Sequence, residues 1–420
     1  MVKIAQIDKK SLFNLIIRGS SVLSRFVLLF CLGRYFTTED LGNYGIFYTS
    51  ISLGILLLGV DFYTFANREL LYADDGKKLT VIRNQFLFYI VTYLIFLLPF
   101  VLLFTYDVLP IKYIVFFYFI IIFDHISQEF YRLFTILSYP VFANWLLFLR
   151  NGIWVIMLVA IFLIFKISDY SLSYVFTGWL IGSALSIVLA LTKVYQLYGK
   201  EKLDKVNINW FLNGLKVCSL YFSSTIALIS IEHLNRYLIK YWCGISKLGV
   251  FTFFSQIANF INVVIFTLFI MVIYPKLVEA VNLKNWDNYN SLKDNLNKKV
   301  IFYSIIIGVL LIFLIYPMIY SINKSEYYSY LPTYFLLVLA NIFLNISSVY
   351  HYTLYALKKD SFLFYSTLIG AIFSVTCNII LIQFFSIFGA SIALIASYIT
   401  LLVSKIIFLK KAEAEISQQI

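Results

Sequence analysis

Charge is scarce in this sequence. Only 13% of the 420 residues are Asp, Glu, Lys or Arg, whereas 61% are hydrophobic and the mean hydropathy is +0.88. Soluble globular domains contain about a quarter charged residues and about half apolar ones, so the composition excludes that class. Apolar runs of about 20 residues, the length at which a helix crosses a bilayer, recur along almost the whole chain. The sequence therefore predicts an all-α polytopic membrane protein.

The signatures of several catalytic and metal sites are also missing. The chain contains no GxxxxGK[ST] phosphate-binding loop, no nucleophile elbow and no HExxH pair. Its four cysteines, Cys31, Cys218, Cys243 and Cys377, show neither CxxC nor Cys–His spacing, so we expect buried thiols rather than a disulfide or a zinc site. We expect neither an enzyme nor a bound cofactor or metal.

The apolar runs and the polar breaks between them predict about twelve spans. They lie near Ser11–Leu32, Leu41–Asn67, Asn84–Tyr106, Lys112–Leu137, Phe142–Phe165, Leu172–Tyr195, Trp210–Tyr241, Leu248–Tyr274, Val300–Ile322, Leu331–Leu357, Phe362–Phe385 and Phe388–Leu409. The long connection after the eighth span has apolar residues at helical intervals among charges, which favours an amphipathic cytoplasmic helix near 276–298.

The basic residues indicate the orientation of these spans. The net charge is +12, but the Lys and Arg residues are dispersed between apolar runs rather than gathered in a patch for nucleic acid. With the N-terminus inside, roughly 22 of the 33 Lys and Arg residues fall on the cytoplasmic side and roughly 6 on the other. We therefore expect both termini in the cytoplasm.

A weak internal repeat divides the chain into two halves. "LGNYGIFYTSISLGILLL" from Leu41 and "LGVFTFFSQIANFINVVI" from Leu248 each begin the second span of a six-span half. Two halves of six spans have the same orientation, which is typical of parallel repeats with a substrate cleft between them. The predicted organisation is an N-terminal six-helix lobe over 1–199, a cytoplasmic linker over 200–209 and a C-terminal six-helix lobe over 210–420.

The first predicted span carries two arginines. Asn14, Arg18, Ser21 and Arg25 are spaced four, three and four residues apart, so they share one stripe of a helix. A charged side chain at the centre of a bilayer costs at least ~2.5 kcal/mol, so this stripe predicts a polar cavity or charged partners for the arginines. Helix-packing ion pairs, and for Arg18 snorkelling to the interface, are the alternatives.

Two further cations lie about two turns inside other spans. Arg150 is in the fifth span and Lys216 is in the seventh. With Arg18 and Arg25 they are candidates for a cationic wall, because forked guanidinium groups and a lysine ammonium suit phosphate oxygens. Such a wall predicts an anionic, phosphorylated ligand.

The acids in the spans are candidates for gating or ion coupling. Asp61 is near the inner end of the second span, where it either has such a role or pairs with a nearby arginine. In "FDHISQEFYRLF", Glu129 and Arg132 either neutralise each other, or Asp124, His125 or Glu129 carries a proton or binds sodium. H+ and Na+ are the candidate coupling ions if the acids have that role.

The seventh span has another charged series toward its outer side. Glu232 precedes Arg236 by four residues, which is the favourable order for an ion pair along a helix. The two residues form either a structural pair or an outer gate.

The chain as a whole resembles the Wzx-type polysaccharide repeat-unit flippases of the multidrug/oligosaccharidyl-lipid/polysaccharide (MOP) exporter superfamily. The features that carry the resemblance are "TTEDLGNYGIFYTSISLGILLLGVDFYTFANREL", the arginine-bearing first span, twelve spans with both ends inside, and the echo "SKLGVFTFFSQ" in the second half. The resemblance covers essentially the full length.

This resemblance implies a MATE-like pair of six-helix lobes. It implies alternating-access transfer of undecaprenyl-diphosphate-linked oligosaccharide, for O-antigen or capsule, from the cytoplasmic to the periplasmic leaflet of a bacterial inner membrane. It also implies that Arg18 and Arg25 bind the diphosphate. The expected partners are this lipid-linked oligosaccharide, membrane lipids, and the polymerase and chain-length proteins of the same pathway.

Other functions are open at this stage. A cation-coupled drug or metabolite exporter of the same superfamily is one, although an arginine-lined cleft would repel cationic compounds. A polymerase or glycosyltransferase is another, although every predicted outer loop is short. A channel or scaffold is the third, and the repeat and the charges within several spans count against it.

Overall fold

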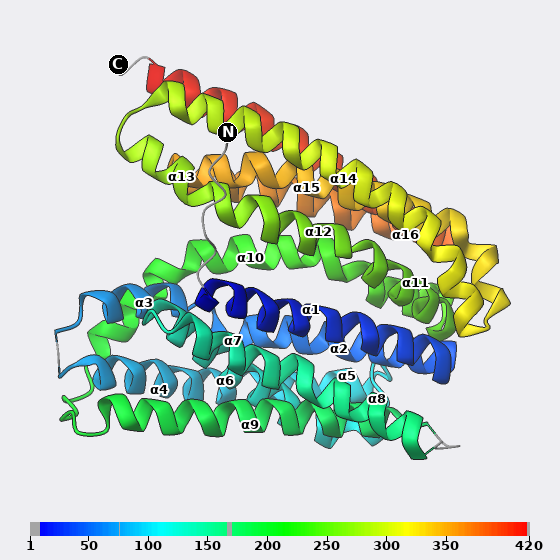
Figure 1. The fold of residues 1–420 in the computed structure, drawn as a ribbon, viewed down its shortest axis with the longest axis horizontal. Helices are drawn as coiled ribbons and strands as arrows, with labels where there is room; N and C mark the ends of the chain where they lie inside the picture. Colours follow the sequence, from blue (N-terminus) through cyan, green and yellow to red (C-terminus); the bar gives the residue numbers. More distant parts are fainter. Residues whose placement is uncertain (1–8, 75, 166–169, 418–420) are drawn as a thin grey trace. The chain divides into compact units, whose positions relative to one another are not determined.

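A computed structural model describes residues 9–417 except 75 and 166–169, and it contains helices but no β-strand over these residues (Figure 1). The main helices are α1 (Lys9–Tyr35), α2 (Thr38–Gly59), α3 (Tyr63–Tyr72), α4 (Lys78–Phe96), α5 (Leu102–Thr105), α6 (Ile114–Ile136), α7 (Pro140–Phe148), α8 (Trp154–Phe165), α9 (Leu172–Tyr198), α10 (Ile208–Cys243), α11 (Ile245–Ala258), α12 (Phe260–Ile265), α13 (Met271–Asn282), α14 (Trp286–Ile322), α15 (Leu331–Ala356) and α16 (Asp360–Ser417). Short 3-10 or π segments are η1 (Leu98–Val101), η2 (Ile111–Tyr113), η3 (Leu149–Ile153), η4 (Phe266–Ile270) and η5 (Ser325–Tyr330).

The helices have the length and apolar character of membrane spans. Within the described residues, ten helices pass this test, and an eleventh counts if the two bent parts of α10 form one span. The last helix, α16, contains two of the predicted spans, because Ser386 between them has non-helical dihedral angles (φ 57°, ψ −140°). All twelve predicted spans therefore fall on helices, and the chain is a multi-pass membrane protein.

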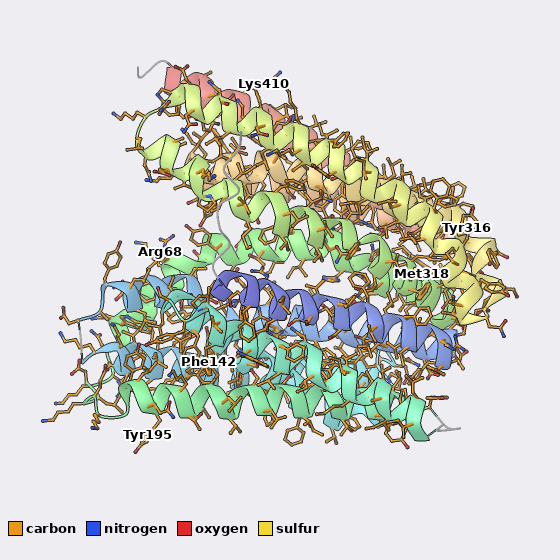
Figure 2. All side chains as sticks on the ribbon, in the orientation of Figure 1. Arg68, Phe142, Tyr195, Tyr316, Met318 and Lys410 are labelled. Atoms are coloured by element: carbon orange, nitrogen blue, oxygen red, sulfur yellow. The ribbon has the colours of Figure 1, made fainter. Side chains whose placement is uncertain are left out.

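The outer faces of the helices are rich in large apolar side chains. Figure 2 shows side chains projecting from the helices all along their length, among them Tyr195 on α9 and Tyr316 on α14. Both tyrosines are exposed, as are many Leu, Ile, Val and Phe residues. A soluble protein does not expose so much apolar surface, whereas a bilayer is a suitable solvent for it.

The chain divides into two compact units. Unit 1 comprises Met1–Phe36 and Ile46–Phe222, and unit 2 comprises Thr37–Gly45 and Ser223–Ile420. Each of the helices α2 and α10 has residues in both units, and the boundary between Phe222 and Ser223 lies within α10. The sequence placed the linker somewhat earlier, at residues 200–209.

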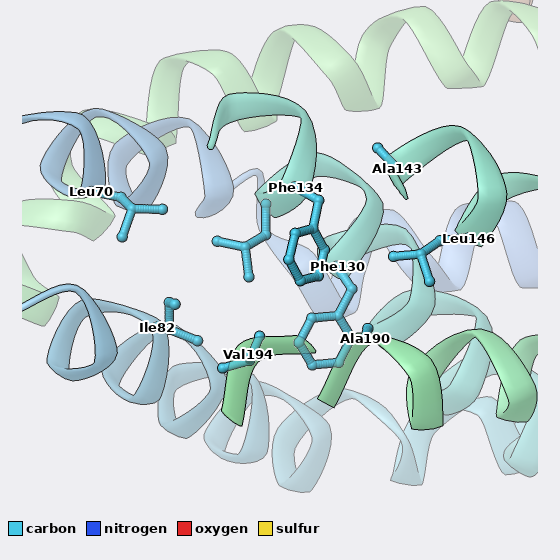
Figure 3. Close-up of a cluster of buried hydrophobic side chains, with 9 residues drawn as sticks. Leu70, Ile82, Phe130, Phe134, Ala143, Leu146, Ala190 and Val194 are labelled. Carbon is cyan, nitrogen blue, oxygen red and sulfur yellow. The ribbon is translucent and has the colours of Figure 1, made fainter. Parts of the chain in front are cut away.

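Helix α6 is central to unit 1. It packs against α7 and α9, and its buried face includes Phe130, Leu133 and Phe134. Figure 3 shows Phe130 and Phe134 among apolar side chains from α3, α4, α7 and α9. The aromatic and aliphatic side chains join five helices, so the position of α6 in unit 1 is fixed by packing on several sides.

Helix α15 has the corresponding place in unit 2. It packs against α11, α12, α13, α14 and α16. Its buried face includes Tyr334, whose hydroxyl donates to the Leu311 main-chain oxygen at 3.0 Å. Among the other buried residues of α15 are two asparagines, Asn341 and Asn345.

A close approach of backbones packs the start of α2 against α11 within unit 2. A Cβ atom built on Gly249 would lie 1.8 Å from the Thr38 main-chain oxygen. No other residue type fits this position without a shift of the helices. The repeated Leu-Gly pairs at Leu41 and Leu248, noted in the sequence, thus begin two helices that touch each other.

Residues 276–298 differ from the sequence prediction. We expected a separate amphipathic helix there, but α13 continues to Asn282 and α14 already begins at Trp286. The Asn285 side chain accepts a hydrogen bond from the Asn288 main-chain N–H and so caps the start of α14. The charged residues of this segment extend two spanning helices instead of forming a third one.

Candidate functional site

The arginine stripe of α1 lies at the edge of its packed face. Asn14 is half-buried and accepts a hydrogen bond from the Asn144 side chain of α7 at 3.1 Å. Ser21 is buried and its hydroxyl donates to the Ile17 main-chain oxygen. Arg18 is half-buried, whereas Arg25 is exposed and makes no hydrogen bond to a described residue. Asn14 and Ser21 therefore belong to the packed face of α1, and Arg18 and Arg25 are more accessible than Ser21.

The arginines do not share the apolar exposed side of α1. Residues two apart on a helix are separated by about 160° when viewed down its axis, since each residue turns it by about 100°. Ile16 precedes Arg18 by two residues, and Leu23 and Val27 flank Arg25 by two residues each. These three apolar side chains are exposed. One side of α1 is therefore suited to lipid, and Arg18 and Arg25 lie on the other.

Arg150 lies in a buried ion pair within unit 1. Its Nε and Nη2 atoms donate to the two carboxylate oxygens of Asp124 at 2.6 and 2.7 Å, and Nη2 also donates to Gln128 at 3.1 Å. The Trp179 indole N–H and the Ser183 hydroxyl donate to the same carboxylate at 3.0 and 3.3 Å. Both charges are desolvated, but the forked geometry and the extra donors satisfy them.

A local change of helix type positions Arg150. Between α7 and α8 the chain forms the π-helix η3, Leu149–Ile153, which contains Arg150. The Trp154 indole N–H donates to the Arg150 main-chain oxygen at 2.8 Å. Such π segments are rare and are frequent at functional sites. The ligand-binding role expected for Arg150 stays a prediction, but its guanidinium is committed to Asp124 in this structure.

Glu129 is the centre of a second buried cluster, one turn further along α6. It accepts hydrogen bonds from Tyr89 at 2.7 Å, Gln85 at 3.0 Å and Arg132 at 2.5 Å. The Arg132 guanidinium also lies 3.7 Å from the centre of the Tyr63 ring. The alternative in which Glu129 and Arg132 neutralise each other is thus what the structure contains.

His125 lies beside this cluster. Its Nδ1 atom is 2.6 Å from the Tyr93 hydroxyl, and its Nε2 atom is 3.8 Å from a carboxylate oxygen of Glu129. Its side chain is fully buried. Asp124, His125 and Glu129 therefore each have partners within the protein, from α4, α6, α9 and η3. Their expected role in ion coupling stays a prediction.

Arg25 also interacts electrostatically with the Asp124–Arg150 pair. Arg25 is near enough to act electrostatically on the Asp124 carboxylate, although that carboxylate already binds Arg150. The pair Asp124–Arg150 is neutral, so the charge of Arg25 is added to a balanced group. An exposed cation beside a saturated ion pair is in a position to bind an anionic ligand.

Comparison with known proteins gives the fold a name. No family model matches the sequence, and no curated protein matches it. Among solved structures, the chain resembles the inward-facing conformation of a multidrug resistance MATE family transporter of the MOP superfamily, with a TM-score of 0.73 and 15% identity over 98% of this chain and 99% of that one. It also resembles the lipid II flippase MurJ in an inward closed conformation, with a TM-score of 0.74 and 16% identity over 96% of this chain and 87% of that one. The outward-facing MATE conformation gives a TM-score of 0.63 and 16% identity over 97% of each chain.

The chain has the fold of these MATE transporters and of MurJ, which we call the MOP fold. At these identities the likeness concerns the fold alone. The predicted fold class, an all-α protein with two six-helix halves of the MATE type, is thereby confirmed.

Within this MOP fold the other predicted site residues are scattered. Lys216 is exposed on α10. Asp61 is buried in the break between α2 and α3, where both it and Val60 have left-handed dihedral angles. Its main-chain oxygen accepts a hydrogen bond from Thr64. In unit 2, the Arg236 guanidinium donates to the Glu232 main-chain oxygen at 2.8 Å and lies 2.8 Å from the His233 Nδ1 atom.

Several polar residues of this MOP fold were not predicted from the sequence. In unit 1 these are mainly neutral groups that hold the two carboxylates: Gln85, Tyr89, Trp179 and Ser183. In unit 2 they are the asparagines at the α11–α12 break and on α15: Asn259, Asn262, Asn341 and Asn345. The available signal was the presence of amide side chains within apolar runs, where each costs free energy unless it has partners.

Proposed function

We propose that the chain is a flippase that moves a polyprenyl-diphosphate-linked oligosaccharide across the bacterial cytoplasmic membrane. The observation that carries this proposal is the position of Arg25, exposed within a spanning helix and turned about 160° from its apolar exposed residues. Arg18 follows the same edge of the helix. The two guanidinium groups would bind the diphosphate.

The physical argument concerns the charge of the diphosphate. Transfer of such an anion through hydrocarbon is prohibitive unless its charge is compensated and its oxygens are hydrogen-bonded. Arginine remains charged at all relevant pH values and offers a fork of N–H donors to phosphate oxygens. Arg25 can serve this purpose because Asp124 is already saturated by Arg150, Trp179 and Ser183.

A drug or metabolite exporter is the second candidate. The likeness to a multidrug resistance MATE transporter favours it as much as the likeness to MurJ favours a flippase. The two candidates differ in the ligand charge that they require. Cationic compounds need an acidic or aromatic site, whereas Arg18 and Arg25 would repel them.

The proposal is tested by replacing both arginines. We expect Arg18→Ala/Arg25→Ala to lower export of the surface glycan by about tenfold or more, since charge-assisted hydrogen bonds contribute about 1.5–3 kcal/mol each. Lipid-linked single repeats should accumulate on the cytoplasmic leaflet. Lipid extraction and a leaflet-selective periodate or lectin assay measure both quantities. Arg18→Lys/Arg25→Lys should retain part of the activity.

Arg34→Ala provides the matched control. Arg34 is exposed at the end of the same helix, and its guanidinium lies 5.8 Å from the centre of the Tyr35 ring. Export should be close to wild type in this variant. Normal glycan in the double alanine variant would contradict the diphosphate role. Single repeats that accumulate at the cell surface would instead indicate a polymerase.

A further inference from the structure

A row of asparagine side chains connects two helices of unit 2. The Asn262 amide N–H₂ group donates to Asn259 Oδ1 and to Asn341 Oδ1, both at 2.6 Å. Asn262 Oδ1 in turn accepts from the Asn345 amide at 2.6 Å. These bonds tie the α11–α12 break to α15. They also fix which way each amide faces, because every donor needs an oxygen opposite it.

The row ends at an exposed amide. Asn259 lies between α11 and α12 and is exposed, while Asn341 and Asn345 are buried. Its oxygen accepts from Asn262, and its N–H₂ group donates to no group among the described residues. An amide with free donors in the middle of a span is costly in hydrocarbon. This end of the row therefore requires water or a polar ligand.

Aromatic rings from η4, α13 and α15 continue the row. The Phe266 ring is 6.1 Å from Tyr352, Tyr352 is 5.4 Å from Tyr274, and Tyr274 is 5.8 Å from Tyr355, measured between ring centres. Phe266 and Tyr355 are exposed, with 37% and 41% of their surface accessible. Phe266 begins the π-helix η4, directly after the α12 turn that carries Asn262.

The amides and the rings form one continuous strip. On α15 the strip passes through Asn341, Asn345, Ser348, Tyr352 and Tyr355, whose spacings of four, three, four and three residues keep them on one side of the helix. Fourteen residues of helix measure about 21 Å. We define the amide–aromatic strip as these five residues together with Asn259, Asn262, Phe266 and Tyr274. It carries no carboxylate and no cation.

We propose that the amide–aromatic strip is the binding site for the sugar residues of the transported lipid, an inference that rests on the flippase function proposed above. Amide groups both donate to and accept from hydroxyl groups, which sugars present in every direction. Aromatic rings pack against the apolar faces of pyranose rings while their edges remain hydrated. The length of the strip accommodates several sugar units. The strip carries no carboxylate to balance the charge of a cationic drug, although its rings can attract a cation.

The test compares two probes bound to the full chain in lipid nanodiscs. One is the organism's own lipid-linked oligosaccharide and the other is bare undecaprenyl diphosphate. We expect Asn259→Ala/Phe266→Leu to weaken binding of the oligosaccharide probe about tenfold or more and to leave binding of the bare lipid unchanged. Arg25→Gln should weaken both probes. The control is Asn288→Ala/Phe302→Leu, which changes an exposed amide and an exposed ring outside the strip and should weaken neither.

The outcomes separate the two proposals. If neither probe binds to the wild-type chain, the flippase function fails. If both probes bind through Arg25 but Asn259→Ala/Phe266→Leu binds the oligosaccharide normally, the sugar site is wrong and the flippase function stands. If the same variant instead loses binding of tetraphenylphosphonium, with no effect on either lipid, the strip is a site for apolar cations. A melting temperature close to wild type for each variant shows that folding is intact.

Discussion

The fourth predicted span of each half, α6 in unit 1 and α15 in unit 2, has a polar interior of a different kind. On α6, Asp124 and Glu129 are ionisable and buried, and each is surrounded by donors from neighbouring helices. On α15, Asn341 and Asn345 are neutral amides that donate to main-chain oxygens of their own helix and form hydrogen bonds with Asn262. The first arrangement is closed and the second has an exposed end at Asn259.

This difference indicates a division of labour between the units. A buried ion pair is costly to disturb, because loss of one partner leaves a charge in a medium that cannot solvate it. The α6 clusters therefore act as an internal frame for unit 1, beside which Arg25 is exposed. Amides can exchange a protein partner for a ligand at small cost. The α15 row is thus better suited to direct contact with a neutral ligand.

The internal repeat makes the comparison more specific. In the alignment that places Leu248 on Leu41, the positions of Asn259 and Asn262 correspond to Ser52 and Ile55. The first half therefore has no amide pair at this point of its second span. The amide–aromatic strip is a property of unit 2 and not of the fold.

Removal of the Asp124 charge should have the largest effect. In Asp124→Asn the Arg150 guanidinium stays buried without its counter-charge, which we expect to lower the free energy of unfolding by about 3–5 kcal/mol. Thermal unfolding in nanodiscs, followed by tryptophan fluorescence, measures the loss. In Asp124→Leu/Arg150→Met both charges are absent, and most of the stability should return.

Asp287→Asn is the control for this prediction, since Asp287 is exposed in the first turn of α14. Its melting temperature should be near that of the wild type. Unchanged stability in Asp124→Asn would mean that Arg150 finds other partners or water, and that the α6 cluster is no frame.

Glu129→Gln should have a smaller effect than Asp124→Asn. Arg132 would lose its carboxylate, but 27% of its side chain is exposed and the Tyr63 ring lies 3.7 Å from it. Water and the ring can stabilise the remaining cation, so we expect a loss of about 1–3 kcal/mol by the same unfolding measurement. Tyr63→Leu should lower the free energy of unfolding more when it is added to Glu129→Gln than when it is made in the wild-type chain. Additive losses would show that the ring does not compensate.

Much of the fold could be predicted from the sequence. Apolar runs between polar breaks predicted every span, because the bilayer requires about 20 apolar residues in each helix. The prediction of a separate helix near 276–298 was wrong. Apolar residues at helical intervals do not distinguish a new helix from the continuation of two spanning helices. The cap at Asn285 decides this, and it is a property of a single side chain.

The contacts of the candidate site were harder to predict from the sequence, because some partners are far apart along the chain. Glu129 and Arg132 are three residues apart on α6, and the sequence offered their pairing as an alternative. Asp124 and Arg150 are 26 residues apart and belong to different spans, so no local pattern connects them. Helix geometry placed Arg18 and Arg25 on one stripe, but only the packing of α1 distinguishes their side from the apolar exposed side.

The smallest effect on stability is expected for Asn345→Leu. This change removes the donor to Asn262 Oδ1 and the bond to the Asn341 main-chain oxygen, but leucine fills a similar volume. Side-chain hydrogen bonds between membrane helices contribute about 0.6 kcal/mol on average, so we expect a loss of about 0.5–1 kcal/mol. Ser348→Ala, next on the strip, is the control, because that hydroxyl donates only to the Leu344 main-chain oxygen. A loss of about 3 kcal/mol or more in Asn345→Leu would equal the Asp124→Asn effect. The amides of α15 would then be a structural frame like that of α6, and the division of labour between the two units would be wrong.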